Sequence, residues 1–297
     1  MKDRAMQTLY KFALEPIAEV TADTCSYGFR PKRNTRDAII HCCNILDKDR
    51  SVEWILKIDI KSCFDMISHA WLMNHIFMDK MMLERFLKSG YIDKMYFFPT
   101  TEGVPQGGTI SSLLCNMTLD GLERLLYEEF GCDVHMIRYA DDILVLGTNK
   151  QFLVHRVTPF IKSFLAQRNL ELSKEKTQIT HINNGFCFLG WKIYKEKNHI
   201  ISVPTRANID SLLTKINAIL SCEQYITPQE QYKYVRPIVR GWITYYIGLA
   251  QEQSLYGVEF EVLSLLHSLG VNQGAEFVGQ LFARYLQYHK KGGKKHE

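Results

Sequence analysis

Two apolar stretches of the chain carry aspartates where strands are expected. In residues 137–146, β-favouring segments stand on both sides of Ala140-Asp141-Asp142, which predicts a strand, a tight turn and a returning strand. Residues 54–65 form a second β-like run, and its Asp59 stands between two isoleucines. A carboxylate is costly to bury unless it is paired or bound to a metal. The two stretches therefore predict strands whose aspartates are paired or bind a metal.

Helical spacing of apolar residues predicts most of the other elements. The periodic segments are residues 3–20, 35–46, 67–76, 82–87, 112–130 and 152–170. Pro16 is expected to end the first helix, because proline lacks the backbone N–H that a helix interior needs. The glycine-rich loop 103–111 opens the long helix 112–130, and the run 186–191 predicts another hairpin.

Pro204 marks a change of pattern. Before it, strands and helices mix; after it, the apolar spacing is purely helical over residues 209–220, 228–249 and 260–288. The predicted fold class is α+β, with a mixed body over 1–202, a helical domain over 203–289 and a basic tail over 290–297.

Composition narrows the class of protein. The 297 residues are 46% hydrophobic, enough to bury the core of one large domain or two. Eight cysteines occur without a Cys-x-x-Cys pair, which argues against a zinc module and favours reduced thiols. No apolar run reaches the roughly 18 residues of a membrane span, and the N-terminus lacks an apolar signal core. A cytoplasmic protein without membrane contact is expected.

Positive charge is clustered more than the formal net charge of +4 suggests. Arg30, Lys32, Arg33 and Arg36 crowd one short segment, where phosphate contact is the favoured interpretation. For the lysines of the tail 290–297, a solvated chain end is favoured.

The aspartates suggest metal-dependent phosphoryl transfer. Asp59 and Asp141 are too distant in sequence to share an element, so only a sheet could bring them together. Such a pair suits Mg²⁺, and two ions can activate a hydroxyl and stabilise a leaving oxygen. A solvated Asp-Asp turn is the alternative for Asp141-Asp142 alone. The loop 103–111 lacks a Gly-Lys-Ser/Thr ending, so it does not predict a P-loop.

Seven short motifs, taken in order, resemble bacterial group II intron-encoded reverse transcriptases. They are Ser26-Tyr27-Gly28-Phe29-Arg30-Pro31, the Asp59 strand with Phe64-Asp65, Gly103-Val104-Pro105-Gln106-Gly107-Gly108, Tyr139-Ala140-Asp141-Asp142, Glu175-Lys176-Thr177, Phe188-Leu189-Gly190, and Gly241-Trp242 with Tyr245-Tyr246. Each is weak alone, but the ordered set is specific and covers roughly residues 3–250. The resemblance implies a right-hand polymerase, with a palm and partial fingers followed by a helical thumb and maturase domain.

The resemblance also implies roles at the reacting centre. Asp59, Asp141 and Asp142 would bind two Mg²⁺ ions, the first two as the more direct ligands. Lys176 would neutralise or protonate the departing pyrophosphate. Phe64 would lie beneath the incoming sugar, where a stiff ring excludes a 2′-hydroxyl and so selects dNTPs.

Contacts to the nucleic acid follow from the same resemblance. The implied substrate-binding residues are Phe64, Tyr139, Gln106, Gly107, Gly108, Arg30, Arg33 and Arg4. The glutamine and the two glycines would border the nascent base pair and the template backbone. Phe188, Leu189 and Gly190 would grip the DNA primer, and the Gly241-Trp242 helix would lie along the duplex or contact intron RNA.

The chain departs from the family pattern in three ways. The family carries a long N-terminal fingers stretch that holds the triphosphate; this chain is expected to begin inside it, with Arg4 as the remaining finger contact. A truncated gene, a fragment, a homodimer or a separate fingers-supplying partner would account for that. Ser112 stands where the family has proline, and the Cys/His cluster of the endonuclease domain is missing.

Three functions stay open at this point. The first is RNA-directed DNA polymerization with an RNA template, a DNA primer, dNTPs and Mg²⁺. The second is a catalytically weak or inactive maturase that binds intron RNA and assists its splicing. The third is a related reverse transcriptase of a retron, a CRISPR system or phage defence.

Overall fold

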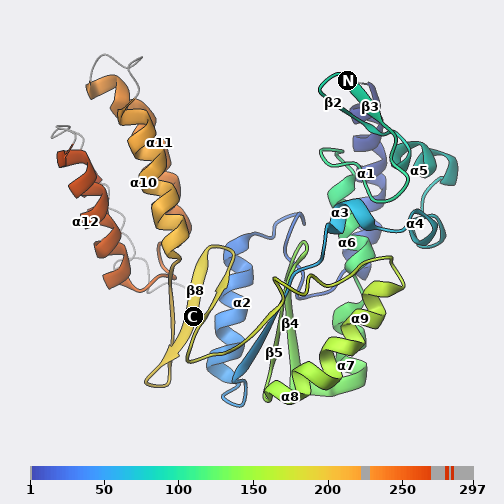
Figure 1. The fold of residues 1–297 in the computed structure, drawn as a ribbon, viewed down its shortest axis with the longest axis horizontal. Coiled ribbons are helices and arrows are strands. Elements are labelled where there is room, and N and C mark those ends of the chain that lie inside the picture. Colours follow the sequence, from blue (N-terminus) through green and yellow to red (C-terminus); the bar gives the residue numbers. More distant parts are fainter. Residues whose placement is uncertain (1, 222–227, 269–277, 281, 284–297) are drawn as a thin grey trace. The chain divides into compact units, whose positions relative to one another are not determined.

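The computed structural model describes residues 2–221, 228–268, 278–280 and 282–283 (Figure 1). The chain divides into two compact units, Met1–Ile182 and Asn183–Glu297. This division lies earlier than the expected boundary after residue 202. The reason is that the strands after Ile182 form a sheet of their own, which is joined to the helices that follow: Ser202 Oγ donates a hydrogen bond to the Leu249 carbonyl at 2.6 Å.

The first unit is a four-stranded antiparallel sheet with helices. Its helices are α1 Lys2–Thr21, α2 Thr35–Lys48, α3 Cys63–Met66, α4 His69–His75, α5 Lys80–Leu87, α6 Ser111–Leu119, α7 Leu122–Phe130, α8 Lys150–Phe152 and α9 Thr158–Ala166. Its strands are β1 Trp54–Ile58, β4 Val134–Tyr139, β5 Asp142–Gly147 and β6 Gln178–His181 in the order β4-β5-β1-β6, and a small hairpin of β2 Tyr91–Asp93 with β3 Tyr96–Phe98. The predicted 137–146 hairpin and the Asp59 strand are confirmed.

Alternation along the strands gives the sheet two different faces. One face carries Leu56, Ile58, Ile143 and Val145, which join the large core formed with α6, α7 and α9. Helix α2 lies on the opposite face (Figure 1), where the side chain of His135 bonds Asp49 just beyond the C-terminal end of α2. Asp59 follows β1 on this second face, because side chains alternate along a strand.

Two helix predictions need correction. Helix α1 continues through Pro16 to Thr21, although proline costs a hydrogen bond, because Leu14 and Ala18 on either side of it are buried in the core. The single helix expected over 112–130 is two helices, α6 and α7. They separate at Gly121, which has φ +92°, a left-handed conformation that suits glycine.

The second unit has a three-stranded sheet and helices. Its strands are β7 Phe186–Phe188, β8 Trp191–Glu196 and β9 His199–Pro204, and its helices are α10 Arg206–Leu220, α11 Pro228–Tyr246 and α12 Glu252–Ser268. The hairpin expected over 186–191 is confirmed. The end of the expected 260–288 helix and the tail 290–297 fall largely outside the described residues. No described helix is both long and apolar enough to cross a membrane.

Candidate active site

The strand register brings two distant aspartates to the same edge of the sheet. Strands β1 and β5 are antiparallel and pair Ile58 with Ile143, and β4 pairs Tyr139 with Asp142. Asp59, one residue beyond Ile58, is therefore level with Asp142. Ala140 and Asp141 form the turn between β4 and β5, with Ala140 at φ +56°.

Lys176 reaches Asp59 through the other neighbour of β1. The segment before β6 follows β1 closely: the Ser173 N–H donates to the Asp59 carbonyl at 2.8 Å, and the Lys61 N–H donates to the Glu171 carbonyl at 2.9 Å. This pairing sets Lys176 Nζ 3.9 Å from Asp59 Oδ1. The Lys176 side chain is 71% exposed, so water screens the pair and the lysine is weakly held.

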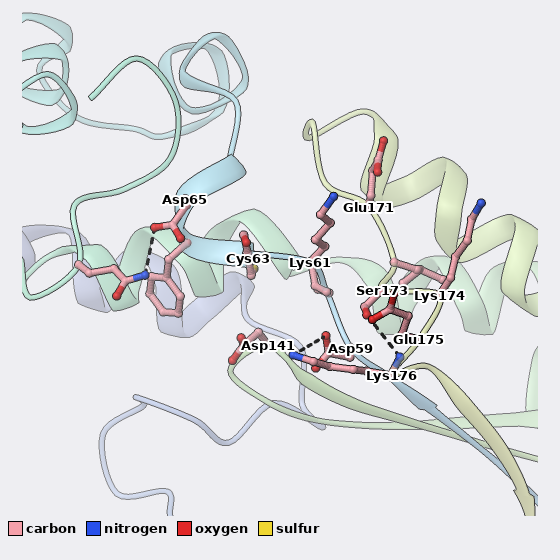
Figure 2. A pocket seen from close by; sticks show the side chains of 15 residues that line it. Asp59, Lys61, Cys63, Asp65, Asp141, Glu171, Ser173, Lys174, Glu175 and Lys176 are labelled. Atoms are coloured by element: carbon pink, nitrogen blue, oxygen red, sulfur yellow. Dashed lines mark hydrogen bonds and ion pairs between the residues drawn. The ribbon is translucent and has the colours of Figure 1, made fainter. Parts of the chain in front are cut away.

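These residues line one cavity of about 760 Å³ (Figure 2). Its wall comprises Asp59, Ile60, Lys61, Ser62, Cys63, Phe64, Asp65, Gln106, Asp141, Glu171, Leu172, Ser173, Lys174, Glu175 and Lys176. In Figure 2 the Lys176 ammonium lies between the carboxylates of Asp59 and Asp141. Five carboxylates and three ammonium groups make the wall acidic, which favours a cation over a bare phosphate.

The pKa of Asp142 is affected by the charges of both other aspartates. Burial raises the pKa of its carboxyl; the charge of Lys57 opposes this, while those of Asp141 and Asp59 raise the pKa further. The described residues contain no group of three or more His, Cys, Asp or Glu side chains assembled to hold a metal ion. The donors nevertheless fit Mg²⁺, since carboxylate oxygens are its preferred ligands and the Lys176 cation already lies beside Asp59.

Phe64 and Gln106 form a wall of the cavity together with Asp65, a motif residue to which the sequence assigned no role. Gln106 Nε2 donates to Asp65 Oδ1 at 3.0 Å, and the Val104 N–H donates to the Phe64 carbonyl at 2.7 Å. A Cβ at Gly103 would lie 2.5 Å from the Asp65 carbonyl carbon. The glycine-rich loop is therefore pressed directly on α3.

Three other predicted contact residues do not line the cavity: Gly107 and Gly108, which follow Gln106 in the loop, and Arg4, which lies on α1. The Thr109 N–H donates to Gln7 Oε1 at 3.0 Å, and the Thr109 hydroxyl donates to the Arg4 carbonyl at 3.4 Å. Helix α1 thus supports the loop, and the Arg4 side chain is exposed.

The Ser26–Pro31 motif supports the aspartate turn from behind. The Tyr27 N–H donates to the Arg138 carbonyl at 2.8 Å, and Asn116 Nδ2 donates to the Gly28 carbonyl at 2.7 Å. A Cβ built on Gly28 would lie only 2.4 Å from the Ala140 backbone nitrogen. Glycine is needed here because the backbone of this loop touches the backbone of the turn.

A buried arginine supports the same turn. Arg138, 0% exposed, pairs with Asp120 and donates to Asn116 Oδ1 at 3.1 Å and to the Ala140 carbonyl at 3.4 Å. Burial raises the pKa of Asp120 to about 6, against the opposing charge of Arg138. A buried charge of this kind is retained only with its partners in place, so the pair helps to set the position of the turn.

The structure uses Arg30 inside the protein. Its side chain is 6% exposed, and its guanidinium pairs with Glu19 at 2.8 Å and donates to the carbonyls of Asp23 and Ser26 at 2.7 and 2.9 Å. These contacts weigh against the phosphate role expected for Arg30. Arg33 also makes contacts within this segment: it donates to the carbonyls of Thr24 and Ser26 at 2.5 and 3.2 Å, and its guanidinium lies over the Tyr27 ring at 5.2 Å.

The expected primer-grip residues belong to the second unit. Phe188 is 1% exposed and pairs with Trp191 in the β7–β8 hairpin, and Leu189 and Gly190 form its two-residue turn. They are thus positioned by a different set of elements from the aspartates.

Some residues of the site were missed by sequence reasoning. Asp65 belongs to the Phe64-Asp65 motif but was given no role, and Lys61 and Lys174, which also line the cavity, each lie two residues from a predicted site residue. The sequence marks the other two residues differently. Asn116 is a polar residue inside an apolar helix, and Arg138 is an arginine inside an apolar strand; both need a buried partner.

Comparison with known proteins gives a family and several relatives. Residues 1–193 match the family described as reverse transcriptase (RNA-dependent DNA polymerase). Protein YkfC of Escherichia coli (strain K12) is 29% identical over 243 residues, which cover 67% of this chain and 62% of YkfC.

Two further relatives have more specific names. Group II intron-encoded protein LtrA of Lactococcus lactis subsp. cremoris is 25% identical over 258 residues, covering 64% of this chain and 43% of LtrA. Maturase-like protein 1 of Euglena gracilis is 28% identical over 260 residues, covering 83% of this chain and 52% of the relative. The chain therefore spans less than two thirds of the length of each of these relatives.

Proposed function

Because the chain belongs to the reverse transcriptase (RNA-dependent DNA polymerase) family, we propose that it extends a DNA primer along an RNA template, as a polymerase of the group II intron type. One observation carries this proposal. The cavity gathers Asp59, Phe64, Gln106, Asp141 and Lys176 from four separate segments of the chain. A pair of aspartates, an aromatic wall and an exposed lysine ammonium are groups that nucleotidyl transfer can use.

The carboxylates of Asp59 and Asp141, with Asp142 beside them, would hold Mg²⁺. When bound, the two ions would activate the primer 3′-hydroxyl and stabilise the charge on the leaving pyrophosphate. The protein would contribute orientation: the turn held by Arg138 and Gly28 keeps Asp141 on the same cavity wall as Asp59.

The remaining residues of the wall act on the nucleotide. The Phe64 ring would exclude a 2′-hydroxyl, and the Gln106 amide, which donates to Asp65, would border the nascent base pair. Lys176 can leave Asp59, because their exposed contact is weak, and donate a proton to the pyrophosphate. Lys61 adds positive charge on the same wall.

Primer extension by the full chain tests this function. A labelled DNA primer on an RNA template is incubated with dNTPs and Mg²⁺, with Asp141→Asn as the variant and Asp47→Asn, an exposed position on α2, as the matched control. If the Asp141 carboxylate supplies about 4 kcal/mol through the metal, the variant loses about a thousandfold in rate. Full activity of Asp141→Asn, or no extension by the wild type, would refute the proposal.

A second function, assistance to the folding of intron RNA, is favoured by the likeness to a maturase-like protein across 83% of the chain. Splicing assistance would use RNA-binding surfaces and not the aspartates. Splicing of an intron RNA that survives in Asp141→Asn while primer extension is lost would show both functions. Splicing that is lost together with extension would count against a separate role.

A further inference from the structure

Helix α1 has apolar side chains on two opposite faces. Leu14 and Ala18 on its inner face are buried in the core of the first unit. On its outer face every exposed position from residue 5 to residue 20 is apolar, and we call this set the α1 stripe: Ala5, Met6, Leu9, Phe12, Ala13, Pro16, Ile17 and Val20. A helix at the surface of a globular protein normally has charged and polar residues on its outer face. The stripe therefore indicates a face that another element covers.

The α1 stripe has the size of an interaction surface. The exposed fractions of its large side chains run from 41% for Ile17 to 86% for Val20, with Phe12 at 65%. At roughly 100 Å² for each of these side chains, the stripe presents on the order of 500 Å² of apolar surface, and patches of this size mark interaction sites. Two such stripes packed on each other would bury about 1,000 Å², which is the area that a specific interface needs.

The large aliphatic residues of the stripe are placed symmetrically about Ala13. Leu9 and Ile17 lie four residues before and after it. Met6 and Val20 lie seven residues before and after it. Two copies of α1 that pack antiparallel across Ala13 therefore place each of these residues opposite its counterpart in the other copy, which is the self-complementarity that a two-fold interface requires. The small side chain of Ala13 at the crossing point lets the helix axes approach to the roughly 8–10 Å of close helix packing.

We propose that the α1 stripe is the interface of a homodimer, in which the α1 helices of two copies pack antiparallel about Ala13. The stripe carries no charged side chain, so it offers no contact to the phosphates of a nucleic acid, whereas it suits a second apolar stripe. The inner face of the same helix holds the glycine-rich loop, because Gln7 Oε1 accepts a hydrogen bond from the Thr109 N–H at 3.0 Å. The dimer would thus hold α1 from the side opposite to that loop.

Sedimentation velocity of the full chain tests this proposal. It is measured from about 0.5 to 50 μM, which brackets a micromolar dissociation constant. The variants are Leu9→Glu, Ile17→Lys and the double variant that combines them. Phe260→Glu is the control, because Phe260 is a large apolar residue that is 72% exposed on a different helix, α12. The wild type and this control should both sediment as dimers.

Each single substitution should raise the dimer dissociation constant at least about a hundredfold, because symmetry places the new charge against an apolar side chain twice in each dimer. The double variant should recover most of the affinity, since positions 9 and 17 face each other across the axis and their opposite charges can pair. A folding defect would not be repaired by a second charged residue.

Ala13→Cys tests the crossing point. Under mild oxidation this variant should form a disulfide between two copies, because the two substituted positions lie against each other, and the wild type controls for the native cysteines. A monomeric wild type, whose stripe would then be covered by the second unit or by a different protein, would overturn the proposal. A dimer that survives both single substitutions would also overturn it. A dimer that shows neither recovery in the double variant nor a cross-link through Ala13→Cys would overturn the pairing about Ala13.

Discussion

Gly28 offers a direct test of how the aspartate turn is supported. A Gly28→Ala substitution adds one methyl group, and its position is defined: the new Cβ would lie 2.4 Å from the Ala140 nitrogen and 3.0 Å from both the Ala140 Cβ and the Tyr139 carbonyl carbon. The φ of Gly28 is not in the left-handed region, so alanine adds no backbone strain of its own. The effect is therefore purely steric.

The size of the effect follows from these contacts. To reach an ordinary contact of 3.4 Å, the Cβ and the Ala140 nitrogen must separate by about 1 Å. The loop cannot yield alone, because the Gly28 carbonyl is held by Asn116 and the Tyr27 N–H by Arg138. Overpacking of this kind costs about 1–3 kcal/mol of stability. A shift of about 1 Å in the turn that carries Asp141 should lower the rate of nucleotide addition by about a hundredfold.

The assay is single-turnover addition of one dNTP at saturating primer–template, with urea unfolding of the same samples. Gly257→Ala on α12 is the matched control, since its Cβ would meet no atom within 4 Å. That control should keep the wild-type rate and gain up to about 1 kcal/mol of stability, because alanine favours helix. A Gly28→Ala protein that is destabilised yet adds nucleotide at the wild-type rate would refute the claim that this loop sets the turn.

Substitutions at four other positions each test a single residue. Lys176→Ala should lower the addition rate about 10- to 100-fold, with partial retention in Lys176→Arg; a rate unchanged in Lys176→Ala would exclude proton donation by this side chain. Phe64→Ala should raise ribonucleotide incorporation, measured by dNTP and rNTP competition, and constant discrimination would remove its role at the sugar. Arg33→Ala should weaken RNA binding. It should also lower the slope of the RNA-binding constant against salt concentration by the equivalent of about one phosphate contact. Arg30→Ala should instead cost about 1–2 kcal/mol of unfolding free energy with the same salt dependence, because it removes the partner of Glu19. The Arg30 hydrogen bond lowers the pKa of Glu19 below its ordinary 4.5, so this loss should be complete above pH 4.5 and shrink as the pH falls below it.

Local pattern was sufficient for the elements that carry the chemistry. The Asp59 strand and the hairpin around Asp141 are short runs of β-favouring residues bounded by turn signals, and such runs depend little on the rest of the chain. The pairing of β1 with β5 and β6, which brings Asp59 beside Asp141 and Lys176, depends on strand order and register. Register depends on which faces are buried together, which no single segment encodes.

Two of the expectations that differ from the structure share one cause. The break between α6 and α7 at Gly121 lies beside Asp120, whose partner Arg138 is in strand β4. The charge of the motif around Arg30 predicts a phosphate site, but Glu19 on α1 pairs with Arg30. In both cases a tertiary contact decides the outcome, and local sequence does not contain that contact.

A divalent cation shared by Asp59 and Asp141 is the feature on which the proposed function depends. Binding of Mn²⁺, as a spectroscopic substitute for Mg²⁺, can be measured by electron paramagnetic resonance on the full chain with a dideoxy-terminated primer, an RNA template and the next dNTP. Asp59→Asn and Asp141→Asn should each weaken Mn²⁺ binding at least about tenfold, while Asp47→Asn should bind Mn²⁺ like the wild type. Equal Mn²⁺ affinity in all four proteins would contradict a shared cation.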